Sequence, residues 1–141
     1  MRVHIEQVPE VFDWVAARGQ CSSPQMFLLL TERVKSDVAL MKARLQNTNQ
    51  TLTYTQVSDD AVVVAKERHE GGYMFGGRNV MLKRIPAGVQ VDAKASEGAE
   101  ERMFVALVIL SSDGRCRYEI DREPMELWQV SKRALENLFF S

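Results

Sequence analysis

The segment between Lys66 and Arg84 contains the side chains whose types and spacing are most suited to chemistry. It carries five cationic and two acidic residues, a net charge of +3 in a chain of 141 residues whose formal net charge is −1. Its centre, residues 71–77, reads GGYMFGG and holds four of the eight glycines. Glycine pairs let the backbone approach a ligand closely, and arginines beside aromatic rings can grip an anion or stack on bases. The segment is therefore the first candidate for a binding site.

Two activities fit this segment, and a structural role fits it as well. A small enzyme could use His69 as a general base on an anionic substrate under the glycine loop, with Arg68 and Tyr73 holding that substrate. Because side chains alternate along a strand, the neighbours of His69 face the other way and no carboxylate partner is identified for it. A nucleic-acid binder could instead use the cations and rings of this segment. The structural alternative is a hairpin connection in which Tyr73 and Phe75 cover the edge of the core.

The cysteines do not predict a metal or catalytic site. Two cysteines alone do not make a structural zinc site, which needs four nitrogen or sulfur ligands. Cys116 alternates with Tyr118 and Ile120, so we interpret it as a small buried hydrophobic residue rather than as a disulfide partner of Cys21. We assign no catalytic residue, no metal ligand and no cofactor.

Residues 51–121 predict three short β-hairpins in succession. Alternating or β-branched runs predict strands over 51–57, 61–66, 79–85, 89–94, 103–110 and 115–120. The junctions Ser58-Asp59-Asp60, Pro86-Ala87-Gly88 and Asp113-Gly114 are rich in turn-forming residues. The strand over 103–110 is apolar on both faces, which indicates either a central strand covered on both sides or a strand that faces a partner molecule.

Helical patterns flank the hairpins. We expect helices over 9–18, over 24–47 and from Asp121 to the end, and a short strand over 2–7. The 24–47 helix would be roughly 36 Å long, longer than a sheet of ordinary width requires. If its far end projects, Val38, Met41 and Leu45 could pair with the same helix of a second copy about a two-fold axis. The alternative is that these three residues belong to the core.

Together the elements predict a single α+β domain over residues 1–141. Its curved antiparallel β-meander has about six strands, with the 2–7 strand as an optional addition, and packs against the long helix of the N-terminal half and the C-terminal helix. The order of elements is shared with helix-grip folds, and the likeness is an analogy in element order alone. The apolar content of 45% is ordinary for a globular domain, and the near-zero net charge predicts no global attraction to nucleic acid or anionic lipid.

The sequence predicts a cytoplasmic protein without a membrane segment. The first residues are not followed by the apolar run of a signal peptide. The most apolar run, residues 103–110, is too short to cross a bilayer as a helix.

These observations favour a non-enzymatic binding module, dimeric through the 24–47 helix. It would hold a small apolar ligand or a protein partner between sheet and helices, because apolar residues and adaptable methionines are abundant. An enzyme acting on an anionic substrate, or a nucleic-acid binder, remains the alternative. The predicted ligand-binding residues are Arg68, His69, Tyr73, Phe75, Arg78 and Tyr118.

Overall fold

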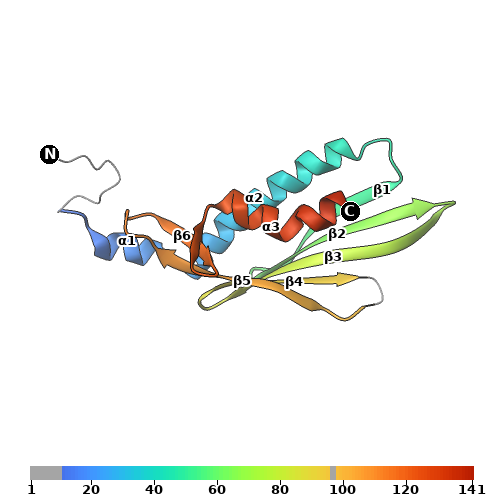
Figure 1. Ribbon diagram of the computed structural model, residues 1–141. Coiled ribbons are helices and arrows are strands. Elements are labelled where there is room, and N and C mark those ends of the chain that lie inside the picture. Colours follow the sequence, from blue (N-terminus) through green and yellow to red (C-terminus); the bar gives the residue numbers. More distant parts are fainter. Residues whose placement is uncertain (1–10, 96–97) are drawn as a thin grey trace.

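A computed structural model describes residues 11–95 and 98–141 (Figure 1). The elements in chain order are α1 (Trp14–Gln20), α2 (Ser23–Arg44), β1 (Gln50–Ser58), β2 (Ala61–Glu70), β3 (Tyr73–Ile85), β4 (Gly88–Ala95), β5 (Glu101–Leu110), β6 (Cys116–Ile120), β7 (Glu123–Met125) and α3 (Leu127–Phe140). The strand predicted over 2–7 lies outside the described residues.

The strands form one open antiparallel sheet in the order β1-β2-β3-β4-β5-β6-β7, so the predicted α+β meander is confirmed. The seventh strand lies where we expected the last helix to begin, and that expected start is wrong. Pro124 sits in β7, at the edge of the sheet, where a residue without an N–H group is tolerated. Helix α3 begins at Leu127 behind a capping box made by Glu126 and Gln129.

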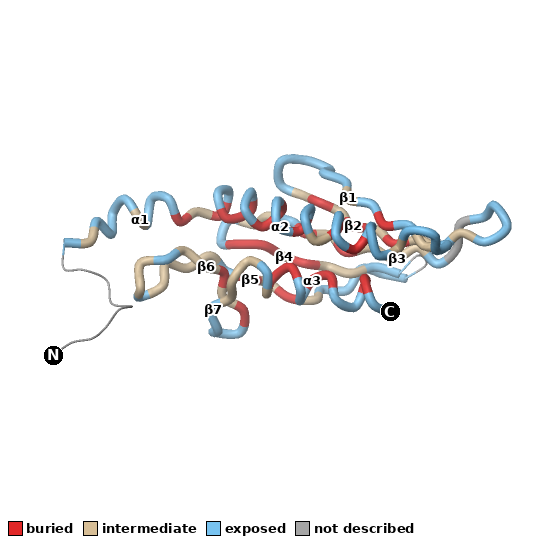
Figure 2. Tube along the Cα trace, turned by 90° about the horizontal axis from the view of Figure 1, so that it is seen from above, coloured by how far each residue is buried: buried red, intermediate tan, exposed pale blue. Residues whose placement is uncertain are grey.

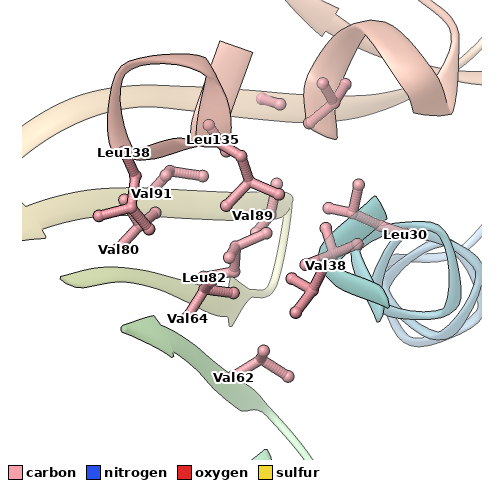
Figure 3. Close-up of a cluster of buried hydrophobic side chains, with 14 of the residues drawn as sticks. Leu30, Val38, Val62, Val64, Val80, Leu82, Val89, Val91, Leu135 and Leu138 are labelled. Carbon is pink, nitrogen blue, oxygen red and sulfur yellow. The ribbon is translucent and has the colours of Figure 1, made fainter. Parts of the chain in front are cut away.

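Helices α2 and α3 lie side by side on one face of the sheet (Figure 1). Their apolar stripes bury the facing side chains of the central strands, and the buried residues run in a line along β4 (Figure 2). Figure 3 shows the centre of this core, where residues of both helices meet those of β2, β3 and β4: Leu30, Val38, Val62, Val64, Val80, Leu82, Val89, Val91, Leu135 and Leu138. In the described part of the chain, neither α2 nor α3 covers the opposite face of the sheet.

Helix α2 settles the two alternatives for its far end. Val38 and Met41 are buried and Leu45 packs against the core, so the pairing surface predicted through these residues is wrong. The helix also ends at Arg44, three residues before the predicted end. Ser22 caps its start, accepting a hydrogen bond from the backbone N–H of Gln25 at 3.3 Å.

Helix α1 differs from the helix predicted over 9–18. It begins at Trp14, behind Asp13, whose side chain accepts a hydrogen bond from the N–H of Ala16 at 3.0 Å. None of its residues is buried, and Val15 is 62% exposed. The helix extends beyond the end of the sheet (Figure 1), so the inward apolar stripe predicted for it has no surface to cover.

Cys21 and Cys116 form a disulfide, with their Cα atoms 5.3 Å apart. The interpretation of Cys116 as a simple buried hydrophobic residue is therefore wrong. The bond joins the start of α2 to β6 across a separation of 95 residues. It fixes the α1–α2 junction onto the β6 end of the sheet.

The glycine segment 71–77 is not a loop. Strand β2 continues to Glu70 and β3 begins at Tyr73, so a two-residue turn at Gly71-Gly72 joins them. Both turn glycines have positive φ values, 56° and 83°, which glycine adopts without strain. Gly76, with φ at 61°, lies opposite a shift of register between Lys66 and Arg68. The glycines thus serve a turn and an irregularity in a long hairpin.

Candidate functional site

A cavity of about 410 Å³ lies between the C-terminal half of α3 and strands β3, β4 and β5. Helix α3 contributes Ala134, Asn137 and Leu138, and the strands and the β4–β5 connection contribute Arg78, Asn79, Val80, Ala93, Lys94, Ala95, Gly98, Ala99, Glu101 and Met103. A volume of this size is within the range of roughly 300–1,000 Å³ found for small-molecule sites.

The cavity exists because alanines occupy positions where larger side chains would fill the space. Ala93 pairs with Val80 in the sheet, and Ala95 pairs with Arg78 one step further along the strand. Ala134 lies on the face of α3 that packs toward the sheet and is fully buried. A methyl group at each of these positions leaves the helix and the strands apart without a side chain between them.

The walls of the cavity combine apolar surface with one cation. Val80 and Leu138 are buried and Met103 is half-buried, so they provide an apolar lining. The guanidinium of Arg78 enters from β3, where its Nη2 donates to the main-chain oxygen of Ser141 at 3.5 Å. Lys94 and Glu101 are exposed at the rim. The arrangement suits a molecule with an apolar body and an acidic group.

A smaller pocket of about 190 Å³ adjoins it on the other side of Arg78. Its buried member is Lys66, whose Nζ donates to the carbonyl oxygen of Phe139 at 3.1 Å and to the main-chain oxygen of Ser141 at 3.2 Å. The last carbonyls of a helix lack intrahelical partners and carry partial negative charge, so a cation is favourable there. Burial, and then repulsion from Arg78, lowers the pKa of Lys66. Lys66 therefore acts as a cap for α3.

An apolar groove of about 250 Å³ runs between α2 and α3. Leu40 and Phe140 are 66% and 67% exposed at its edges, and Leu135 and Phe139 form its floor. A hydrogen bond from the buried Ser131 hydroxyl to Asp37, 2.7 Å long, joins the two helices beside the groove. The groove is open to solvent and has mixed charges at its rim.

The predicted site residues do not form one site. Arg68 and Arg78 are brought together at the smaller pocket. Tyr73 is 71% exposed at the hairpin tip, and the side chain of Phe75 lies outside what the structure describes. Nε2 of His69 is 3.1 Å from the hydroxyl of Thr51, and no described carboxylate hydrogen-bonds to it. The arrangement expected of an enzyme using His69 is absent from the described residues.

The basic segment is divided between the two faces of the sheet. Lys66 and Arg78 point toward α3, whereas Lys83 lies on the opposite face. The Arg84 guanidinium is bound to Asp60 at 2.7 Å, and Arg68 lies 3.6 Å from Glu70. These cations do not form the continuous surface that a nucleic-acid strand would follow.

Tyr118 is a core residue and does not line the cavity. It is fully buried on β6, and its hydroxyl has no hydrogen-bond partner among the described residues. Burial raises the pKa of this phenol. Its inward direction follows from alternation along the strand, as predicted, but the ligand-binding role predicted for it has no geometric support.

The residues that line the cavity were missed, apart from Arg78. Most are small or apolar, and such residues resemble ordinary core positions in a sequence. The alternation Ala93-Asp92-Val91 and the small residue Ala134 within an otherwise bulky apolar stripe are the signals that could have pointed to unfilled space.

No family model, curated protein or solved structure matches the chain significantly. Within residues 11–95 and 98–141, no group of three or more histidine, cysteine or acidic side chains is placed to hold a metal ion. None of the described helices combines the length and apolarity needed to cross a membrane.

Proposed function

We propose that the protein is a non-enzymatic binding module that holds a small ligand in the cavity between α3 and the sheet. The ligand class is an apolar molecule with one acidic group. The observation that carries this proposal is the 410 Å³ space with an apolar lining and a single guanidinium, that of Arg78, on its inner wall. Ligand sites are commonly of this kind, mostly apolar with a few polar groups that fix orientation.

Arg78 supplies orientation because a guanidinium can bind a carboxylate or sulfonate through two parallel hydrogen bonds. Hydrogen bonds to charged groups contribute about 1.5–3 kcal/mol. The apolar lining supplies most of the remaining affinity through burial of the ligand body.

The lining residues favour binding over catalysis. Their ionisable groups are Arg78, Lys94 and Glu101, and Lys94 and Glu101 are at the exposed rim. Acid–base chemistry needs a group whose pKa is near the working pH and which lies within hydrogen-bond reach of the reacting atom. A permanently charged arginine does not meet that need.

The test uses anilinonaphthalene sulfonate, a fluorescent probe with apolar rings and one sulfonate. We expect saturable binding of one probe per chain. Ala95→Phe, which places a ring in the cavity, should weaken binding more than tenfold, and Arg78→Gln should weaken it by about tenfold, the loss of one charged hydrogen bond. Lys35→Phe puts the same ring on the exposed side of α2 and should leave affinity unchanged.

The α2–α3 groove provides the competing location for the probe. Leu40→Glu introduces a charge at that groove and should not change probe affinity. Loss of binding in Leu40→Glu with retention in Ala95→Phe would assign the probe to the groove and reject the cavity. Absence of saturable binding to the unmodified protein would reject the proposal as well.

The disulfide bears on where the module works. Disulfides persist in oxidising compartments, whereas cytosolic thiols are kept reduced. The Cys21–Cys116 bond therefore supports a non-reducing location, and the cytoplasmic location expected from the sequence stays a prediction without support from it.

A further inference from the structure

The face of the sheet opposite α2 and α3, here called the outer face, is identified by strand register. The pairs Val62–Leu82 and Val89–Ala106 are buried beneath the helices. The residues next along each strand must point the other way. These include the pairs Ala61–Lys83, Val63–Met81 and Gln90–Val105.

The outer face is more apolar than solvent exposure explains. An antiparallel sheet with one wet face normally alternates apolar and polar residues along each strand. On β5 the outward residues are Val105, Leu107 and Ile109, and on β2 they include Ala61 and Val63. Leu107 is 41% exposed. Of the two explanations for a strand apolar on both sides, the described helices leave the one in which β5 faces a partner molecule.

The size of this face fits a specific interface. Strands are about 4.8 Å apart and rise about 3.4 Å per residue, so β1–β5, at about nine residues each, present roughly 700 Å². A standard protein–protein interface takes about 800 Å² from each partner. The face is therefore large enough for a stable two-protein contact.

The charges on the outer face favour a second copy of the chain as the partner. Asp92 accepts a hydrogen bond from Gln90 at 3.0 Å and lies 4.0 Å from Arg102, and Lys83 is on the neighbouring strand. Charges of both signs lie among the apolar residues. A nucleic acid or a strongly charged protein would leave half of these groups opposed by like charge, whereas a copy offers both signs in equal number.

The register also makes the face self-complementary. Ala61, Lys83, Gln90 and Val105 share one row across β2, β3, β4 and β5. A two-fold axis parallel to the strands, between β3 and β4, places β5 of one copy over β2 of the other. Val105 then lies over Ala61 of the second copy, a large side chain over a small one. Lys83 lies over Gln90 of the second copy, one row from its Asp92.

We infer that the protein forms a two-fold dimer through the outer face, with β5 of each copy packed on β2 of the other. Both sheets then bury their apolar outward residues, as in the face-to-face packing of β-sandwiches. The cavity under α3 is on the other face and stays open in this dimer.

The test uses engineered cysteines. Equal amounts of Ala61→Cys and Val105→Cys are mixed and oxidised gently, and cross-links are identified by non-reducing electrophoresis and peptide mass spectrometry. We expect a 61–105 cross-link between chains in the mixture and little cross-linking of either variant alone. The reason is that the two-fold axis separates like positions by three strand spacings, about 14 Å, beyond the reach of a disulfide. Lys35→Cys on α2 serves as the control for random collisions.

Light scattering at upper-micromolar protein concentration gives the independent measurement. The unmodified protein should have the mass of a dimer, and Val105→Asp should be a monomer with an unchanged circular dichroism spectrum. An unmodified protein that is monomeric there, or cross-linking through Lys35→Cys as efficient as the 61–105 pair, would overturn the inference. A dimer that survives Val105→Asp would do so too.

Discussion

The two ends of the sheet are built differently. At the end near α1, the turn between β3 and β4 is held by Ser23, whose buried hydroxyl lies 2.7 Å from the Ile85 carbonyl oxygen and 3.1 Å from that of Gly88. The disulfide joins the same end of α2 to β6. At the other end, where the β2–β3 hairpin projects, the ion pair between Arg68 and Glu70 is 3.6 Å long and about half exposed.

This difference separates stability from binding. The end near α1 uses covalent, buried hydrogen-bonded and close backbone contacts, which leave no free volume. The other end has alanines over the cavity and one buried lysine, Lys66, that caps α3. A binding module needs both, because a ligand site must have space while the frame around it stays fixed. The comparison predicts that equal changes cost much more at the first end than at the second.

The largest expected effect comes from Gly88→Ala. A Cβ atom at Gly88 would overlap the carbonyl oxygen of Ala106 and lie 2.9 Å from the Cα of Leu107, so β4 and β5 would have to separate. We expect a loss of more than about 3 kcal/mol in the free energy of unfolding, measured by urea denaturation. Gly77→Ala, at the hairpin end, meets only the Glu67 side chain at 3.5 Å and should cost under about 1 kcal/mol.

Equal losses in the two glycine variants would show that the ends are equally adaptable and would remove the basis of the comparison. The measurement needs folded protein only for Gly77→Ala. Failure of Gly88→Ala to fold is the extreme form of the expected result.

The second effect concerns the disulfide. Closing a loop of nearly a hundred residues removes about 4 kcal/mol of chain entropy from the unfolded state in the entropic model. The double variant Cys21→Ser/Cys116→Ser should therefore unfold at lower denaturant concentration by an amount corresponding to about 2–4 kcal/mol. Probe binding at native conditions should be retained, because the bond lies at the end of the sheet away from the cavity. Loss of probe affinity in the folded variant would show that the two ends are coupled.

The meander was predictable because its signals are local. Alternation along strands such as 89–94 and turn residues such as Asp113-Gly114 act over a few positions. Strand β7 was missed because it has three residues and contains Pro124, which in the sequence looks like the first turn of a helix. The glycines of 71–77 resemble a loop because a turn and a register shift require the same backbone freedom.

The cavity and the disulfide depend on contacts between distant parts of the chain. Ala93 and Ala134 are about forty residues apart, and no sequence pattern shows that their small side chains meet across empty space. Cys21 gives no signal of its partner for the same reason. Lys66 reads as one charge in a basic segment, and only the position of α3 shows that it binds the helix end. Local chemistry was therefore predictable, whereas the use of each charge was not.

The smallest expected effect is pH-dependent and belongs to the end near α1. Arg117 donates to Asp113 and Glu126, each at 2.9 Å. Hydrogen bonding from Arg117 lowers the pKa of Asp113 from 3.8 to about 2 and also lowers that of Glu126. A lowered carboxyl pKa stabilises the folded state above the ordinary value, and this contribution is lost as pH falls through the folded value.

Arg117→Gln should therefore reduce the acid dependence of stability between pH 3.8 and about 2, because the unfolded and folded carboxyl groups then titrate together. Thermal unfolding followed by circular dichroism across that range measures the change. The matched control is Lys132→Gln, which removes an exposed ion pair to Glu136 at the surface of α3 and should leave the profile as it is. Identical profiles for Arg117→Gln and the unmodified protein would mean that the network around Arg117 does not hold this end of the sheet.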